Sequence, residues 1–195
     1  MRIGIFGGTF DPIHWGHLVL AEEARTAARL DRILFVPSAV PPHKQGRKLT
    51  DWSHRFEMVR LALDGEADFA LSDIESDPGR PHYSLDTLDR LAARHSDDEL
   101  SFLIGSDSLL DLPYWQKPLA IIARWPLVVL ARPGFDVALA DPMFTRQMTL
   151  VDGVQVAVSS TLVRRRLAAG DSVKYLVPAP VIAYARVHQL YGLVS

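Results

Sequence analysis

The stretch that most constrains this chain is a glycine turn between an apolar segment and a helix-forming segment. Residues 2–6 are mostly apolar and short enough to form a buried strand. Residues 18–28 are rich in helix formers, and their small and apolar side chains recur at helical spacing. Between them lies the run Gly7-Gly8-Thr9-Phe10-Asp11-Pro12-Ile13-His14-Trp15-Gly16-His17. The order predicts a strand, a glycine turn and a helix in direct succession.

The residues of this turn suit a phosphate chain. Gly7 and Gly8 adopt backbone angles closed to other residues and let a ligand approach the main chain. The start of a helix offers unpaired N–H groups and a partial positive charge. If His14 and His17 both lie in the first helical turn, they share one face, about 5–6 Å apart at Cβ. Together with the hydroxyl of Thr9, they predict two imidazoles and a row of amides converging on phosphates.

Two familiar phosphate-binding patterns are absent from this turn. It lacks the lysine of G-x-x-x-x-G-K-[ST], so it is not a P-loop. It also lacks G-x-G-x-x-G, so the dinucleotide-binding fingerprint is missing. Taken singly, each histidine is more typical of a helix cap or a solvated residue. The phosphate hypothesis therefore depends on the whole pattern.

Composition excludes several classes of partner. The chain has 195 residues, 48% of them hydrophobic and 23% charged, which fits one domain of ordinary size. A net charge of −2 gives no field that favours nucleic acid or an anionic membrane. The absence of cysteine rules out disulfides and thiolate metal sites and fits a cytoplasmic location. We expect no secretory signal and no membrane span, because neither a basic leader nor an apolar run of about 18 residues occurs.

Further apolar runs predict a parallel sheet. A second strand over residues 32–36, reached through the first helix, implies a right-handed βαβ unit. The other predicted strands are 69–74, 100–105 and 125–131, followed by a possible hairpin of 148–151 with 154–158 around Asp152-Gly153. Helices are predicted over 52–63, from 82 to about 95, and over 181–191. In such open α/β sheets ligands bind outside the carboxyl ends of the strands.

The loop after the second predicted strand lies at that sheet edge and carries basic groups. Residues 37–44 contain three prolines, which stiffen the loop from which His43 and Lys44 project. These two side chains are either ordinary solvated charges or cations placed on a substrate phosphate. Arg55, in the helix that follows, is interpreted as a solvated surface residue.

Three more residues follow predicted strands, and two of them allow two interpretations. Ser84 is a candidate N-cap of its helix. Asp107 either caps a short helix or accepts hydrogen bonds from ribose hydroxyls. Trp115 either fills the core at a helix junction or stacks on a flat heteroaromatic ring.

The run Ser159-Ser160-Thr161-Leu162-Val163-Arg164 predicts a second phosphate cradle. Either serine can cap the helix that begins here, and the hydroxyls gather at its positive end. Arg164 lies one turn further on, where a guanidinium reaches the same anion. The simpler interpretation is a capped basic amphipathic helix, since three successive arginines point in different directions.

The run G-G-T-F-D-P-x-H-x-G-H-L resembles the signature of the nucleotidyltransferases with an (H/T)-x-G-H motif. In this form it is similar to the bacterial nicotinate mononucleotide adenylyltransferase family. The segments P-P-H-K at 41–44, L-P-Y-W at 112–115 and S-S-T-L-V-R at 159–164 extend the resemblance over nearly the whole chain. It implies a Rossmann-like open parallel sheet flanked by helices, in one domain over residues 1–195. Residues 158–195 would carry the S-S-T-x-x-R motif and the closing helices.

The resemblance also implies an enzyme that transfers AMP from ATP to nicotinate mononucleotide in NAD biosynthesis, releasing pyrophosphate. His14 and His17 would be catalytic. Residues expected to bind ATP and its phosphates are Gly7, Gly8, Thr9, Phe10, Lys44, Ser160, Thr161 and Arg164. Residues expected to bind nicotinate mononucleotide are His43, Lys44, Ser84, Asp107 and Trp115, although His82 and Ser84 stand where the family has Ser and Thr. Mg²⁺ would accompany ATP, and no residue is assigned as its ligand, because no carboxylate cage is evident.

Two alternatives stay open at this stage. One is a sister adenylyltransferase that prefers nicotinamide mononucleotide or phosphopantetheine. The other is a non-enzymatic nucleotide-binding protein that has kept the cradle. The sequence does not indicate an oligomeric state.

Overall fold

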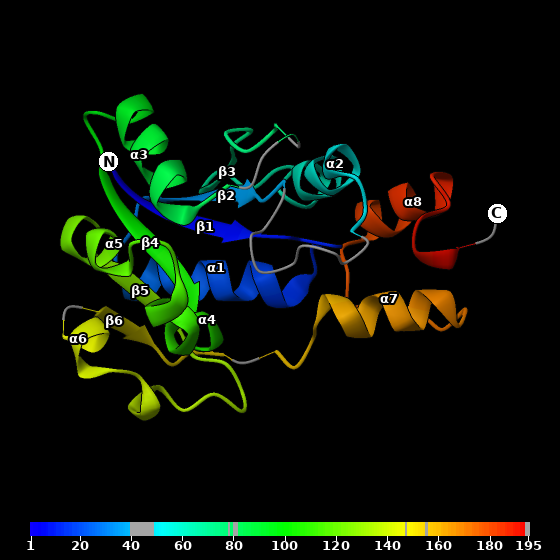
Figure 1. Cartoon of the computed structure of the whole chain (residues 1–195). Helices are drawn as coiled ribbons and strands as arrows, with labels where there is room; N and C mark the ends of the chain where they lie inside the picture. Colours follow the sequence, from blue (N-terminus) through cyan, green and yellow to red (C-terminus); the bar gives the residue numbers. More distant parts are fainter. Residues whose placement is uncertain (40–48, 78, 80–81, 147, 155, 194–195) are drawn as a thin grey trace.

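A single parallel sheet organises the fold, with its six strands in the order β3-β2-β1-β4-β5-β6. The computed structural model describes the whole chain except residues 40–48, 78, 80–81, 147, 155 and 194–195 (Figure 1). The strands are β1 Arg2–Gly8, β2 Arg32–Pro37, β3 Phe69–Leu71, β4 Glu99–Gly105, β5 Leu127–Leu130 and β6 Met148–Val151. Every neighbouring pair is parallel. This arrangement confirms the predicted Rossmann-like sheet.

Helices cover both faces of the sheet. They are α1 Trp15–Ala27, α2 Trp52–Ala62, α3 Ser84–Arg94, α4 Ser106–Asp111, α5 Pro118–Arg124, α6 Pro142–Thr145, α7 Ser160–Ala168 and α8 Ala179–Val187. Short 3₁₀ helices lie at η2 Leu112–Tyr114, η3 Val137–Leu139 and η4 Leu190–Gly192. Successive strand residues point to opposite faces. Ile33 and Phe35 therefore join the core under α1, α2, α7 and α8, while Leu34 and Val36 join the core under α3, α4 and α5.

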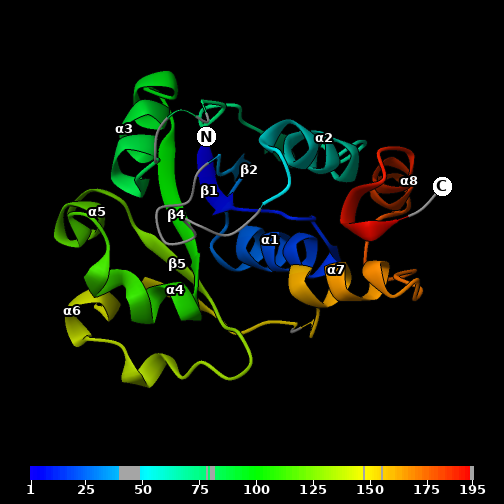
Figure 2. The same ribbon diagram turned by 45° about the vertical axis from the view of Figure 1, so that its right-hand side comes forward.

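The strand order places a topological switch at the centre of the sheet. From β1 the chain moves outward to β2 and β3, and it then returns to β4 on the other side of β1 and continues to β5 and β6. The connections on the two sides diverge, so a crevice opens at the carboxyl ends of β1 and β4. At that end α7 lies beside the start of α1 in both views (Figure 1, Figure 2).

Two predicted strand segments differ from the structure. The strand predicted over 69–74 stops at Leu71. The predicted hairpin is wrong, because Met148–Val151 pairs in parallel with β5 and residues 154 and 156–158 form no strand. Alternation along 148–151 reports a strand but not its partner, and the open edge of β5 was available to it.

The last predicted helix is divided in two. It runs over Ala179–Val187 and is followed by η4, in which Tyr191 has a φ of 60°. Among the helices of the described residues, none is long and apolar enough to span a bilayer.

Candidate active site

The turn after β1 brings the two histidines into direct contact. His14 is the N-cap of α1 and His17 lies three residues on, so both belong to its first turn as expected. Their rings stack with centroids 3.7 Å apart and planes 18° from parallel. The ring of His14 leaves little room above residue 16, because a Cβ there would lie 3.1 Å from its Nδ1. Glycine at position 16 therefore permits the stacked pair.

A backbone hydrogen bond selects the tautomer of His17. The backbone N–H of His14 donates to His17 Nδ1 at 3.2 Å. Because the amide is the donor, Nδ1 accepts and carries no proton. The ring proton of neutral His17 is therefore on Nε2, which makes that atom a hydrogen-bond donor.

His14 is neutral at physiological pH. Its side chain is only 5% exposed, and Nδ1 has no hydrogen-bond partner in the described part of the chain. Burial, and after it the positive charge of Arg132, lower the pKa of His14 from 6.5 to about 4. In the free protein this imidazole offers hydrogen bonding to an anion rather than a positive charge.

Phe10 belongs to the core rather than to the open surface of the turn. Its ring is 2% exposed and packs edge-on against His17, with centroids 5.0 Å apart. Its backbone has a φ of 48°, in the left-handed region. Only the main chain of Phe10 is therefore placed to meet a phosphate, while its ring supports His17 from below.

The start of α7 is attached to the same turn. Ser159 is the N-cap and accepts from the N–H of Leu162 at 3.1 Å, which settles which serine caps the helix. Ser160 Oγ donates to the carbonyl of Pro12 at 2.9 Å. Arg164 donates to the carbonyl of Asp11 at 2.7 Å. The predicted second cradle thus lies against the first.

An ion pair lies where β4 and β5 end. Asp107, in the first turn of α4, contacts Arg132 with 3.1 Å between Oδ2 and the guanidinium. The other carboxylate oxygen, Oδ1, is buried and without a partner among the described residues. The N-cap of α4 is Gly105, so Asp107 is not the cap. Asp107 therefore has one oxygen held by Arg132 and one buried oxygen without a partner among the described residues.

Two further predicted site residues, Ser84 and Trp115, come after β3 and β4 respectively. Ser84 is the first residue of α3 and Tyr83 is its N-cap, so the prediction that Ser84 caps the helix is wrong. The Trp115 ring is half-buried and lies edge-on to Phe102, with centroids 6.2 Å apart. Trp115 is therefore a partly exposed aromatic surface supported by the sheet.

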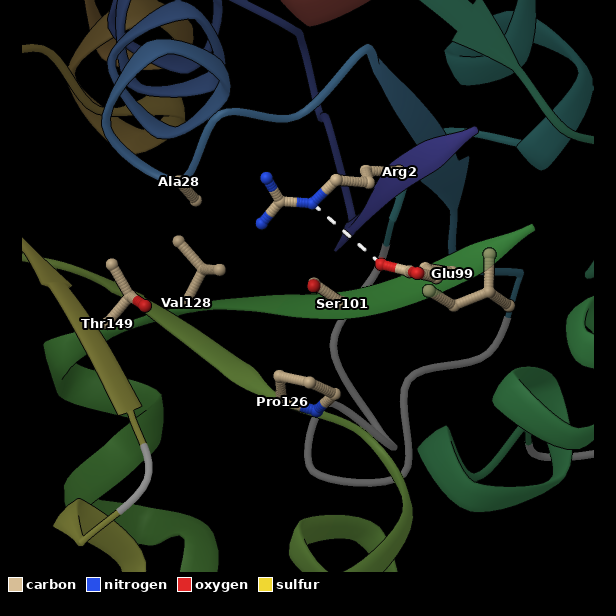
Figure 3. Close-up of a pocket in the computed structure, with 8 residues that line it drawn as sticks. Arg2, Ala28, Glu99, Ser101, Pro126, Val128 and Thr149 are labelled. Carbon is tan, nitrogen blue, oxygen red and sulfur yellow. Dashed lines mark ion pairs between the residues drawn. The ribbon is translucent and has the colours of Figure 1, made fainter.

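One cleft of about 1200 Å³ connects these groups. Its lining includes every predicted site residue that the structure describes, namely Gly7, Gly8, Thr9, Phe10, His14, His17, Ser84, Asp107, Trp115, Ser160, Thr161 and Arg164. His43 and Lys44 lie outside the described residues. A separate small pocket of about 140 Å³ lies at the amino ends of the strands, where Arg2 and Glu99 pair at 3.9 Å (Figure 3). It contains none of the predicted site residues.

Residues 5–166 match the cytidylyltransferase-like family. The chain belongs to this family. It is 42% identical to a probable nicotinate-nucleotide adenylyltransferase of Thermomicrobium roseum, over 100% of this chain and 93% of that protein. A protein of the same name from Geobacillus thermodenitrificans is 40% identical over 98% of this chain and 86% of its own length. These full-length relatives confirm the resemblance to nicotinate mononucleotide adenylyltransferases.

Solved structures show the same fold. Nicotinic acid mononucleotide adenylyltransferase of Plasmodium falciparum, complexed with NaAD, superimposes with a TM-score of 0.81. The match covers 99% of this chain and 98% of that one at 20% sequence identity. The Plasmodium enzyme complexed with APC superimposes equally well.

Three residues of this cytidylyltransferase-like chain were missed or misread from the sequence. Arg132 is a charge partner of Asp107, and its only signal was an arginine directly after a predicted strand. Glu75 lines the cleft, where burial raises the pKa of its carboxyl group and Thr87 Oγ1 donates to it at 2.6 Å. Arg55 is 1% exposed, so its interpretation as a solvated residue is wrong. Local patterns do not report such burial, because the groups that surround it come from distant segments.

The site offers no ready-made metal cage. In the described ranges, no group of three or more His, Asp or Glu side chains is placed to hold a metal ion. Such a donor set does not fit a resident cation held by protein ligands alone. It fits Mg²⁺ that arrives on ATP, because Mg²⁺ keeps several waters and binds phosphate oxygens.

Proposed function

We propose that this protein transfers the AMP moiety of ATP to nicotinate mononucleotide, forming nicotinate adenine dinucleotide and pyrophosphate. The observation that carries the proposal is one cleft that joins the stacked histidines, the start of α7 and the Ser84–Trp115 side. The names of the full-length relatives, both probable nicotinate-nucleotide adenylyltransferases, support the choice of substrates.

The reaction needs positioning more than it needs a base. A phosphate oxygen of nicotinate mononucleotide attacks the α-phosphorus of ATP, and the bond from that phosphorus to the bridging oxygen of pyrophosphate breaks. The attacking phosphate is already anionic, so no proton must be removed from it. What remains is to hold two polyanions in line and to stabilise charge on the α-phosphate and the leaving group.

The histidines and α7 supply that stabilisation. His17 presents its Nε2–H to the α-phosphate as a hydrogen-bond donor. His14, neutral in the free protein, gains a proton more readily once phosphates surround it, because a nearby anion raises an imidazole pKa. Thr161 and the remaining donors of Arg164 face the β- and γ-phosphates. Mg²⁺ bound to ATP would add neutralising charge on the phosphate oxygens.

The opposite side of the cleft suits the acceptor. The exposed part of Trp115 stacks on the nicotinate ring, and the carboxylate of Asp107, which lines the cleft, accepts from a ribose hydroxyl. The N-terminus of α3 at Ser84 presents backbone N–H groups to the nicotinate carboxylate. His43 and Lys44 lie outside the described residues. His43 keeps its proposed role of binding the acceptor, and Lys44 keeps its proposed role of binding the phosphates of both ATP and the acceptor.

Pyrophosphate release with ATP and Mg²⁺ tests the function. Three acceptors are compared: nicotinate mononucleotide, nicotinamide mononucleotide and phosphopantetheine. We expect rapid turnover with the first alone. Preference for another acceptor would replace the acceptor assignment, and no release with any of them would favour a nucleotide-binding protein without activity.

His17 is the residue whose loss most directly tests the mechanism. His17→Ala removes the donor to the α-phosphate, so kcat is expected to fall by about 10²–10³-fold while the protein stays folded. His95→Ala is the control, because His95 lies at the far end of α3 and pairs with Asp98 at 3.1 Å. Near-normal turnover of His17→Ala would remove His17 from the mechanism.

A further inference from the structure

Arg55 is a buried charge that ties three loop segments together. Its guanidinium donates to the carbonyls of Thr9 at 2.7 Å, Ser38 at 2.7 Å, Ala39 at 3.2 Å and Thr50 at 2.8 Å. Thr9 belongs to the phosphate-binding turn, and the other three residues flank segment 40–48. One side chain of α2 therefore joins the turn to both ends of that segment.

Tyr191 meets the same turn from the end of the chain. Its hydroxyl donates to Asp11 Oδ1 at 2.7 Å, across 180 positions of sequence. Asp11 is 3% exposed, and its other oxygen accepts from the N–H of Thr50 at 3.4 Å. Burial, and after it the charge of Asp11, raise the pKa of the Tyr191 hydroxyl well above its usual range, so the group stays protonated and donates.

The backbone of Tyr191 has an unusual conformation, which indicates that its surroundings fix its position. Its φ of 60° and ψ of 26° lie in the left-handed region, which is sterically unfavourable for an ordinary L-residue. A bulky residue keeps such a conformation only where its surroundings specify it. The specific partner of the hydroxyl is the Asp11 carboxylate, three residues before His14.

Neither Arg55 nor Tyr191 lines the cleft, so neither is placed to touch a substrate. Burying a guanidinium is costly, and fully hydrogen-bonded buried charges are often no more stabilising than apolar side chains. What the four carbonyl contacts add is a defined position for the groups they hold. Arg55 holds residue 9 of the turn and Tyr191 holds residue 11, so the position of the histidine pair depends on both side chains.

We propose that Arg55 and Tyr191 are positioning residues for adenylyl transfer, which hold residues 9–12 and thereby the His14–His17 pair in the reactive geometry. This inference rests on the proposed function for its kinetic consequence. Its structural consequence, an ordered turn in the free protein, stands independently of any substrate.

Tyr191→Phe is the most selective test, because it removes one oxygen atom and keeps the ring. We expect kcat to fall by about tenfold, with KM for both substrates within about twofold of the wild type, since the lost order affects the transition state. Arg55→Lys keeps the charge, but one ammonium group cannot reach four carbonyls, so kcat falls by about 10²-fold.

Two matched controls lie near these residues in the sequence, Tyr184 in α8 and Arg60 in α2. Tyr184→Phe also removes one partly buried hydroxyl contact, the one that Tyr184 makes with His54 at 2.9 Å, but this contact does not lead to the turn. Arg60→Lys changes an arginine of α2 that pairs with Glu57 at the surface. Both controls should keep wild-type kcat.

A second readout separates this inference from the proposed function. In the ligand-free proteins, amide hydrogen exchange of residues 9–17 should be about tenfold faster in Tyr191→Phe than in Tyr184→Phe. If the wild type releases no pyrophosphate with any acceptor, the proposed function fails and this exchange experiment alone decides the structural part. Unchanged exchange in a folded Tyr191→Phe would overturn the inference, and so would wild-type kcat in that variant.

Discussion

His14 is a buried histidine whose proposed role is to bind phosphates. In the free protein its side chain is buried and stacked on His17, and the positive charge of Arg132 acts on it. Its charged form is therefore disfavoured until a polyphosphate supplies the opposite charge. Under the proposed function His14 would change its protonation when phosphates occupy the site, whereas His17 is held in one tautomer by a backbone N–H.

The depressed pKa of His14 makes stability depend on pH. The folded-state pKa of about 4 lies below the unfolded value of 6.5, so the unfolded chain binds more protons between these pH values. The contribution of His14 to the free energy of unfolding is therefore fully present above pH 6.5. It is lost as the pH falls to 4, by about 3 kcal/mol in total. Urea unfolding across this range measures the change.

His14→Gln should remove most of that pH dependence, because glutamine does not titrate. His95→Gln is the matched control, since His95 is partly exposed near Asp98. An unchanged loss of stability between pH 6.5 and 4 in His14→Gln would assign the effect to other groups, such as buried carboxyls.

The junction of β4 and α4 shows how an element end shapes the acceptor side. Gly105 ends β4, and both Asp107 and Arg132 pack over its Cα. A Cβ at this position would overlap Asp107 Oδ1 and lie 2.8 Å from Arg132 Nε. The strand must therefore end in glycine for the ion pair to occupy its place.

Gly105→Ala should displace that pair without unfolding the protein, because both groups are ends of flexible side chains. If Asp107 binds the acceptor ribose, KM for nicotinate mononucleotide rises by about tenfold and KM for ATP changes little. Steady-state kinetics with each substrate varied in turn measures this. Equal changes in both KM values would argue against a specific acceptor role for Asp107.

At the scale of the whole molecule, the proposed function would place the two substrates on opposite sides of the switch point. ATP would lie against β1, α1 and α7, and the acceptor against α3, β4 and η2. Because α7 comes from the last quarter of the chain and contacts the first turn, ATP binding should couple the two ends of the sequence.

Thermal unfolding with ATP and Mg²⁺, without acceptor, measures this coupling. At a ligand concentration of about 100 times Kd, binding stabilises by about 2.7 kcal/mol, which raises Tm by roughly 5–10 °C for a chain of this size. Arg164→Ala should lose most of that shift, because its contact with Asp11 and its donors to phosphate are gone. Arg165→Ala, an exposed neighbour, should retain it.

Local sequence patterns predicted most of the fold. The apolar runs of β1, β2, β4 and β5 and the helix that follows the glycine turn were predictable, because a strand or helix needs only its own periodicity to be recognised. The cradle at residues 7–17 was predictable for the same reason, since turn, helix start and histidines are contiguous. The partner of β6 was not, because alternation specifies which side chains face the core and not which edge the strand joins.

The sequence by itself therefore determined most of the strands, the turn proposed to bind phosphate and the residue types assigned to that role. Only the tertiary structure decided that Arg55 is buried, that Arg132 pairs with Asp107, and that Tyr191 meets Asp11. Each of these contacts joins residues from segments far apart in the chain. Their burial and hydrogen bonding depend on how the layers pack around the sheet, and a local sequence pattern does not encode which distant segments come into contact.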